Sequence, residues 1–187
     1  NRHDYFHENG TRLSDHGIER FYFTGYSDTE VEKYFRKLLK GKKLSAEETE
    51  KYKTSLMTSL CIMNCRRGWT QQFHVGAIRN NNRRMFDKMG PDTGWDSIGP
   101  AQDAVKMSEF LSSLDAMNML GKTILYNLNP ADNEMMITMT GNFNDGSIPG
   151  KVQYGDAWWF LDQKSGMEKH LKDLAALGLL SRFVGMV

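Results

Sequence analysis

A histidine and an arginine lie at the end of one predicted strand, and together they could act on an anionic substrate. His74 falls late in the β-prone run 71–78, and Arg79 follows that run directly. A histidine can exchange a proton near neutral pH or bind a metal ion. An arginine can hold a carboxylate through two parallel hydrogen bonds. Two alternatives remain open, in which His74 is a hydrogen-bonded core residue and Arg79 belongs to a solvated or phosphate-contacting loop.

Three further side chains stand at comparable positions. Asp15 and His16 follow a short β-prone run and precede Gly17, a strand-to-loop corner of the kind where catalytic groups are often placed. Adjacent strand residues face opposite sides, so both enter one pocket only if the strand bends there; otherwise they are a turn aspartate and a packed histidine. Trp158 lies in a loop after another strand, where an indole can cover a sugar ring and donate one hydrogen bond. We expect Trp158 to reach the pocket and Trp159 to pack.

The elements that must position these residues alternate between strand and helix. Hydrophobic periodicity and capping signals, such as the Ser45–Glu48 capping box, predict helices at 29–40, from 46 toward 65, and at 101–119, 129–140 and 166–177. Strands are predicted at 11–14, 71–78, 123–128, 151–154 and 182–187. Strands separated by helices call for right-handed crossovers and a parallel sheet, so the predicted class is α/β.

The pattern along the second strand favours a barrel over an open sheet. Phe73, Val75 and Ala77 form one apolar face, whereas the intervening positions include the polar residues Gln72 and His74. A doubly wound sheet would want both faces apolar, but a barrel tolerates polar groups where its interior becomes an active site. We therefore predict a partial (β/α)8 barrel of the TIM type, with about five of its eight parallel strands in a single segment, 1–187.

Composition excludes some partners. The formal net charge is +1, so no global field would draw the chain to nucleic acid or to an anionic membrane. No apolar run approaches the roughly 20 residues of a membrane span, and the start lacks an apolar signal core, which predicts a cytoplasmic protein.

Cys61 and Cys65 lie on one face of a predicted helix, as two buried thiols or as a weak metal pair. Two free thiols fit a reducing compartment best.

The chain also has the beginning expected of an excised piece. It has no starting Met, and it opens in what the pattern indicates to be the last turns of a helix that ends at Asn9-Gly10. We therefore expect a longer parent protein.

Several blocks of residues, in order along nearly the whole chain, closely resemble the uronate (glucuronate) isomerases of the amidohydrolase superfamily. The block at 12–17 reads Arg-Leu-Ser-Asp-His-Gly, and that at 72–82 runs from Gln-Phe-His-Val-Gly-Ala to Arg-Asn-Asn-Asn. The other blocks lie at 67–69, 90–94, 122–130, 150–155, 158–160 and 179–185.

The resemblance implies a distorted, metal-dependent-hydrolase-like barrel with one divalent metal ion, usually zinc. It implies interconversion of D-glucuronate with D-fructuronate and of D-galacturonate with D-tagaturonate, by proton transfer between C2 and C1 through an enediol. It matches His74 to a strand-end histidine near the metal and the reacting oxygens, itself a possible metal ligand together with residues outside this chain. Arg79 and Trp158 match residues of the hexuronate pocket, and Asp15 and His16 match a catalytic strand-end pair. A homo-oligomer is expected.

Two parts of the family pattern are missing from the chain. The family's His-x-His metal pair lies upstream of Asn1, and its Thr-Asp-Ser motif follows the position of Val187, so the first strands and the end of the last one are absent. We therefore expect this chain alone neither to bind zinc tightly nor to isomerise uronates. The alternatives are another metal-dependent hydrolase or decarboxylase of the same superfamily, or a non-catalytic interaction module.

Overall fold

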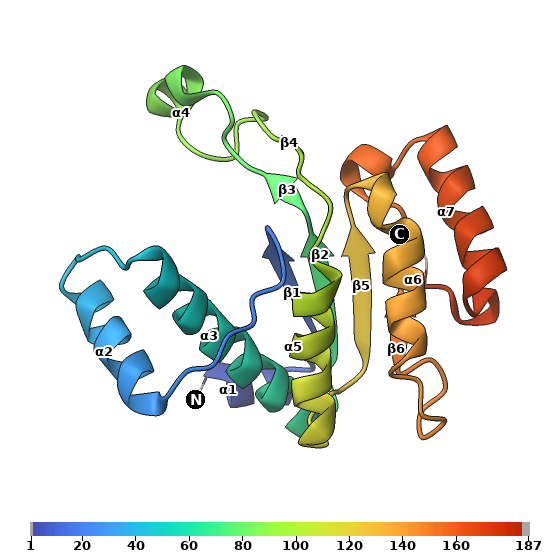
Figure 1. Ribbon diagram of the computed structural model, residues 1–187, viewed down its shortest axis with the longest axis horizontal. Helices are drawn as coiled ribbons and strands as arrows, with labels where there is room; N and C mark the ends of the chain where they lie inside the picture. The colour runs from blue at the N-terminus through green and yellow to red at the C-terminus, as the bar shows by residue number, and fades with distance from the viewer. Residues whose placement is uncertain (1, 185–187) are drawn as a thin grey trace. The chain divides into compact units, whose positions relative to one another are not determined.

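The computed structural model describes residues 2–184, which form two compact units (Figure 1). The first unit is helical and comprises the described part of Asn1–Arg12 together with Phe21–Thr70 and Asp103–Gly121. The second contains a parallel sheet and comprises Leu13–Arg20, Gln71–Gln102 and the described residues from Lys122 onward. Among the described residues, no helix is long and apolar enough to cross a membrane.

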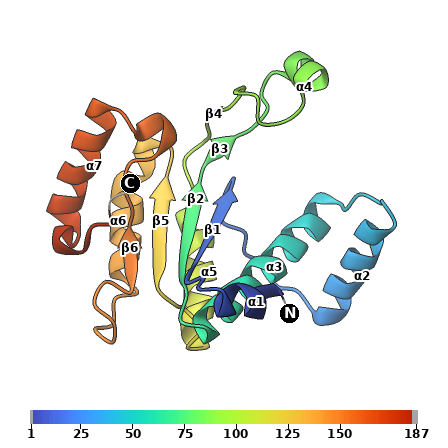
Figure 2. The same cartoon turned by 180° about the vertical axis from the view of Figure 1, so that it is seen from behind.

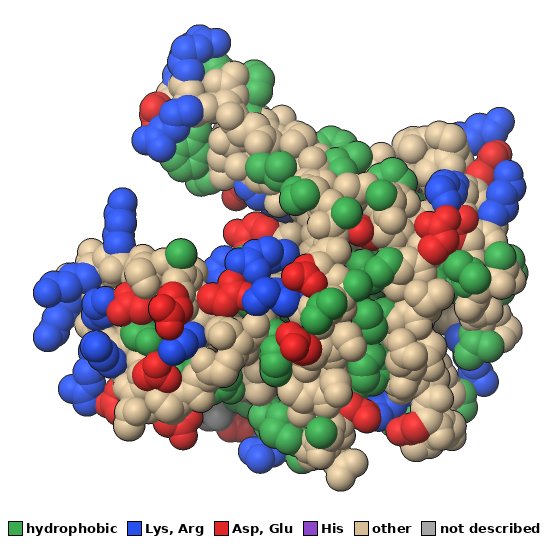
Figure 3. Space-filling view, viewed as in Figure 1, with side chains coloured by type: hydrophobic (Ala, Val, Ile, Leu, Met, Phe, Trp, Pro, Cys, Tyr) green, Lys and Arg blue, Asp and Glu red, His purple; other side chains and the backbone are tan. Residues whose placement is uncertain are grey.

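The helical unit contains α1 (Arg2–Glu8), α2 (Asp28–Leu39), α3 (Ala46–Arg66) and α5 (Ala104–Ala116). The predicted capping box of α3 is confirmed, because the Ser45 side chain accepts from the Glu48 amide while Glu48 accepts from the Ser45 amide. On the face shown in Figure 3, basic side chains over α2 alternate with acidic ones. Arg36, for example, pairs with Glu32 one turn away on α2. This part of the surface therefore carries no one-signed field of the kind that nucleic acid would need.

The sheet has four parallel strands in the order β1-β2-β5-β6, which Figures 1 and 2 show side by side and pointing the same way. They are β1 (Leu13–Ile18), β2 (Thr70–Val75), β5 (Thr123–Asn127) and β6 (Val152–Tyr154). The register places His74 beside Tyr126 and Leu125 beside Tyr154. The α/β class and the parallel sheet agree with the prediction.

Two helices accompany this sheet. The chain after β5 forms a 3-10 turn (Pro130–Asp132) and then α6 (Asn133–Gly141). The predicted Asn129 cap is present, since its side chain accepts from the Ala131 amide at 3.0 Å. After β6 come a second 3-10 turn (Trp159–Leu161) and α7 (Lys164–Leu177), which lies beside α6. The two helices bury apolar side chains, among them Met136, Ile137 and Leu174.

The predicted strand 71–78 is broken in the structure. It ends at Val75, because Gly76 adopts a φ of +105°, a conformation that side-chain-bearing residues rarely take. Ala77–Ile78 (β3) then pairs antiparallel with Ser97–Ile98 (β4) in a separate two-stranded sheet. Between these two strands lies a short helix, α4 (Arg83–Met89), capped by the Asn82 side chain.

The first predicted strand was also wrong in its extent, and the last one is described only in part. The first strand spans Leu13–Ile18 rather than 11–14, so Asp15 and His16 lie inside it and not at its end. In the predicted strand 182–187, Arg182 belongs to a 3-10 turn and Val184 makes one isolated parallel bridge to Gly155. Residues 185–187 lie outside the described part. The described residues show four parallel strands, and the predicted fifth strand falls partly outside them.

Candidate functional site

Asp15 and His74 meet on one face of the sheet, since they project from the neighbouring strands β1 and β2. The Nδ1 atom of His74 lies 2.7 Å from Oδ1 of Asp15. A carboxylate accepts here, so Nδ1 carries a hydrogen, and in the neutral imidazole the lone pair is then on Nε2. The His74 side chain is only 10% exposed, whereas Asp15 is 59% exposed. The pair therefore presents a nearly buried imidazole whose tautomer is fixed by a solvated carboxylate.

Two aromatic side chains hold the His74 ring. Tyr126 stacks on it with ring centroids 4.3 Å apart and planes inclined by 11°, and Trp158 meets it edge-on at 4.5 Å. Burial raises the pKa of the Tyr126 phenol to about 12, and the nearby charges of Asp15 and Asp156 add to this effect. Tyr126 therefore stays protonated at neutral pH and serves as a rigid neutral platform.

A small cavity of about 90 Å³ brings three of the predicted site residues together. Its lining includes His74, Arg79 and Trp158, with Ala77 and the residues 17–19 that follow the middle of β1. The indole Nε1 of Trp158 is buried and has no hydrogen-bond acceptor among the described residues. A buried N–H without a partner costs about 1–3 kcal/mol, so this donor is suited to a ligand oxygen. Ligand pockets usually exceed about 300 Å³, and these residues would thus form one wall of a site.

Arg79 is held beside this cavity by three side chains. Its guanidinium lies 4.7 Å from the ring centroid of Trp159, and Nη1 is 3.5 Å from Asp96 and 3.6 Å from Asp92. Asp96 also accepts from the Asn80 amide at 2.8 Å, which ties the carboxylate to the turn that carries Arg79. The expectation that Trp159 packs holds only in part, since it remains 36% exposed.

His16 is not brought to the cavity. Its ring lies 5.5 Å from that of Phe73, a fully buried residue, because alternate residues of a strand face opposite sides. Asp15 and His74 share one face, and His16 and Phe73 share the other. Burial lowers the pKa of His16, and the Asp15 charge opposes that effect only partly. Asp15 and His16 could enter one pocket only if β1 bent between them, and β1 does not bend there.

The described residues contain no group of three or more histidine, cysteine or acidic side chains that could hold a metal ion. At this cavity His74 has one feature of a metal-binding histidine, namely a carboxylate that orients its ring from the other nitrogen. A catalytic zinc ion needs about three protein ligands. Any metal at this pocket would need further ligands from outside the described residues.

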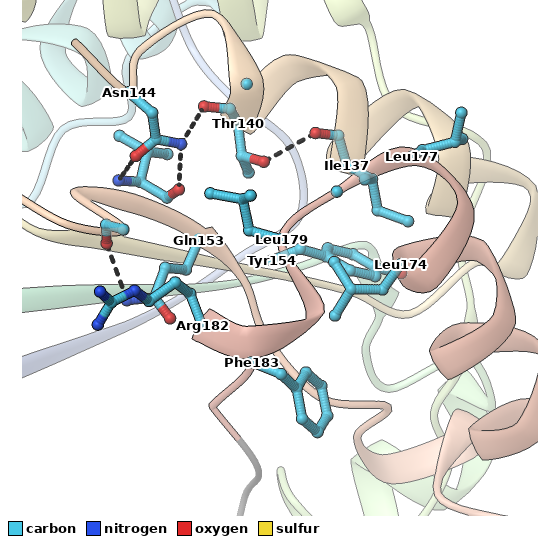
Figure 4. Close-up of a pocket in the computed structure, with 14 residues that line it drawn as sticks. Ile137, Thr140, Asn144, Gln153, Tyr154, Leu174, Leu177, Leu179, Arg182 and Phe183 are labelled. Carbon is cyan, nitrogen blue, oxygen red and sulfur yellow. Dashed lines mark hydrogen bonds between the residues drawn. The ribbon is translucent and has the colours of Figure 1, made fainter. Parts of the chain in front are cut away.

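A larger cavity of about 300 Å³ lies elsewhere in the same unit (Figure 4). Residues of α6, β6, α7 and the turn after α7 line it, among them Ile137, Leu174 and Arg182. Gly150 and Val152 place it at the amino end of β6, whereas His74 lies late in β2. Ligands of parallel α/β sheets bind beyond the carboxyl ends of the strands. The smaller cavity at His74 is therefore the better candidate.

The sequence did not single out a buried polar network beside the site. His170 of α7 is fully buried and donates from Nε2 to the Gly155 carbonyl at 2.5 Å. The Tyr154 hydroxyl lies 3.0 Å from His170 Nδ1 and 2.7 Å from Asn127 Oδ1. Burial lowers the pKa of His170, against smaller opposing effects from the Gly155 bond and nearby acids. Helical periodicity marks position 170 as inward-facing, but only the fold shows its partners.

The lowered pKa values predict that acid weakens the fold. A histidine with a lowered pKa in the folded state binds its proton more readily in the unfolded chain. Its contribution to the free energy of unfolding is therefore present above about pH 6.5 and is lost as the pH falls toward the folded-state pKa. We expect the free energy of unfolding in urea to fall between pH 7.5 and 5.5, by at most about 1.4 kcal/mol per pH unit per group. His170→Gln should flatten this dependence, and an unchanged slope in that variant would contradict the assignment.

Comparisons with known proteins agree with one another. The family model for glucuronate isomerase matches residues 1–187. The chain is 58% identical to the uronate isomerase of Bacteroides fragilis and 56% identical to that of Cellvibrio japonicus, over 186 residues in each case. It is similar in structure to uronate isomerase from Thermotoga maritima, with a TM-score of 0.89 at 32% identity over 99% of this chain and 39% of that one. The chain spans 40% of the length of the two curated relatives.

Proposed function

This chain belongs to the glucuronate isomerase family, and from that premise we propose that it carries part of the active site of an aldose–ketose isomerase acting on hexuronates. The reactions are D-glucuronate to D-fructuronate and D-galacturonate to D-tagaturonate. Each moves a proton between C2 and C1 of the open-chain sugar through an enediol. Such a reaction needs a proton-transfer group, a means of polarising the carbonyl and a hold on the carboxylate.

The observation that carries this proposal is the meeting of three complementary groups at one cavity. His74, with Nδ1 held by Asp15, offers a neutral nitrogen that can take or return a proton. Arg79 offers a planar fork that suits a carboxylate. The unpaired Trp158 indole N–H offers a donor for a sugar hydroxyl or carbonyl oxygen. His16, on the other face, has no direct part in this scheme.

The rest of the proposed machinery lies outside the described residues. We propose that the four parallel strands are part of a (β/α)8 barrel and that the remaining strands belong to a longer parent protein. The polar residues on the His74 face fit the interior of such a barrel. A divalent metal ion, such as zinc, would polarise sugar oxygens when bound there, with His74 as a candidate ligand among the described pocket residues.

A product assay tests the proposal. We expect the full-length protein that contains these residues to convert D-glucuronate into a keto-acid of the same mass when zinc is supplied. The 187-residue chain alone should give neither turnover nor tight zinc binding in a titration, because one wall of a pocket cannot fix a substrate.

Each rival has its own outcome in this assay. A hydrolase or decarboxylase of the same superfamily would release products of altered mass. An interaction module would leave the sugar unchanged in both proteins. Rapid turnover by the isolated chain would contradict the assignment of a partial site.

A further inference from the structure

Gly155, which follows β6, lies directly against the ring of Tyr126. A Cβ atom added to Gly155 would overlap ring carbons of Tyr126, which cannot move aside as the end of a flexible side chain could. Tyr126 is 2% exposed and carries the His74 ring on its own ring, at 4.3 Å. Because Gly155 has no Cβ atom, there is room at this position for the Tyr126 ring on which His74 stacks.

The position of Gly155 is itself fixed from two sides. Its amide donates to the Leu125 carbonyl at 2.9 Å, which extends the ladder between β5 and β6. Its carbonyl accepts from His170 Nε2 at 2.5 Å. The backbone that limits the Tyr126 ring is thus held by β5 and by a buried side chain of α7.

His170 is held in turn by the network around Tyr154. The rings of the two residues stack at 4.0 Å with planes inclined by 10°. The Tyr154 hydroxyl donates to Asn127 Oδ1 at 2.7 Å and lies 3.0 Å from His170 Nδ1. Asn127 also donates to the Asn129 carbonyl at 2.7 Å, so the network joins α7 to the carboxyl ends of β5 and β6. Buried hydrogen bonds are strengthened by the low local dielectric, so a network of this kind holds its members in place.

We infer that Gly155 and His170 are positioning residues for His74, acting through the Tyr126 ring. Among the described residues, the Asp15 carboxylate and the Tyr126 and Trp158 rings contact the His74 ring, and of these three the Tyr126 ring is the one that the buried network supports. That this positioning serves proton transfer by His74 rests on the proposed function. The arrangement of the rings is independent of it.

The test is a histidine NMR experiment on the full chain labelled with 13C at histidine Cε1, which contains five histidines. Stacking on Tyr126 should displace the His74 signal from the position of a free imidazole. We expect Gly155→Ala and His170→Met to move the signal toward that position. His170→Gln should restore it, since the glutamine amide can donate in place of Nε2. The matched control, Leu174→Ala, removes a buried side chain one turn further along α7 and should leave the signal in place.

Several outcomes would overturn the inference. One is a folded His170→Met protein with reduced stability and an unmoved His74 signal. Another is an equal movement in Leu174→Ala. Failure of both Gly155→Ala and His170→Met to fold, with Leu174→Ala folded, would also overturn it, because the network would then serve stability alone.

Activity separates this inference from the proposed function. In the full-length protein, His170→Met should lower kcat on D-glucuronate, on the order of tenfold or more, with little change in KM, because it misplaces a reacting group rather than a binding one. An inactive unmodified protein with the expected NMR shifts would refute the isomerase proposal and leave the positioning role standing. If His170→Met moved the His74 signal but left kcat normal, His170 would fix the ring geometry without affecting turnover, and the catalytic part of the inference would be overturned.

Discussion

His74→Asn lowers kcat of the full-length protein on D-glucuronate by about 10²–10⁴-fold, the range that a positioned proton-transfer group supplies. The asparagine amide nitrogen can take the place of Nδ1 and keep the 2.7 Å hydrogen bond to Asp15. Nothing then replaces the lone pair of Nε2, so the variant loses its proton acceptor while the local fold stays supported. The measurement is steady-state kinetics with D-glucuronate, together with an unfolding curve to show that the variant is folded.

Two comparisons make the His74 result specific. Asp15→Asn leaves the imidazole in place but no longer fixes its tautomer, so a smaller loss is expected. Measuring the zinc content of His74→Asn separates the two roles still open to the histidine, since loss of a ligand would lower metal content and loss of a base would not. Turnover within a factor of a few of the unmodified protein, with normal zinc content, would remove His74 from the mechanism.

The part of this site that was predictable from sequence is local. The alternation of Phe73 and His74 gave the two faces of β2 correctly, because side chains of a strand alternate regardless of the strand's partners. The cap of α3 at Ser45 was also predictable, because a capping box depends only on two residues three positions apart. Asp15 and His16 were harder, since a boundary misplaced by a few residues changes whether the two can share a pocket. Because the strand continues to Ile18, both residues lie within it and their side chains point to opposite faces of the sheet.

The rest depends on pairing between distant segments. Tyr126 lies beside His74 only because β5 is the neighbour of β2 in this register, and no local pattern at 123–127 indicates that. Gly76 could have been an ordinary strand residue by its spacing, but its positive φ redirects the chain into the β3–β4 pair and places Arg79 beyond the main sheet. Asp96 reaches Arg79 only through that second sheet.

Arg79→Lys raises KM for D-glucuronate and lowers kcat/KM by about 10- to 100-fold. This corresponds to about 1.5–3 kcal/mol, the usual worth of a hydrogen bond to a charged group. Lysine keeps the positive charge, so the effect isolates the planar fork, which binds a carboxylate through two parallel hydrogen bonds. Lysine also gives up the broad guanidinium contact with Trp159, now at 4.7 Å. Steady-state kinetics at fixed ionic strength measure the change.

The control for Arg79 lies nearby on the same segment. Arg83 is also an arginine, with a side chain 84% exposed and paired to Asp87 within α4, and Arg83→Lys should leave the kinetics unchanged because exposed pairs contribute little.

A change of substrate supplies the sharper comparison. An uncharged hexose with the same hydroxyls lacks the group that Arg79 is proposed to hold, so its slow turnover should be nearly equal in the unmodified and Arg79→Lys proteins. Equal losses on the acidic and the neutral sugar would mean that Arg79 shapes the loop rather than binding the carboxylate. The recognition of hexuronates would then have to come from another cationic group.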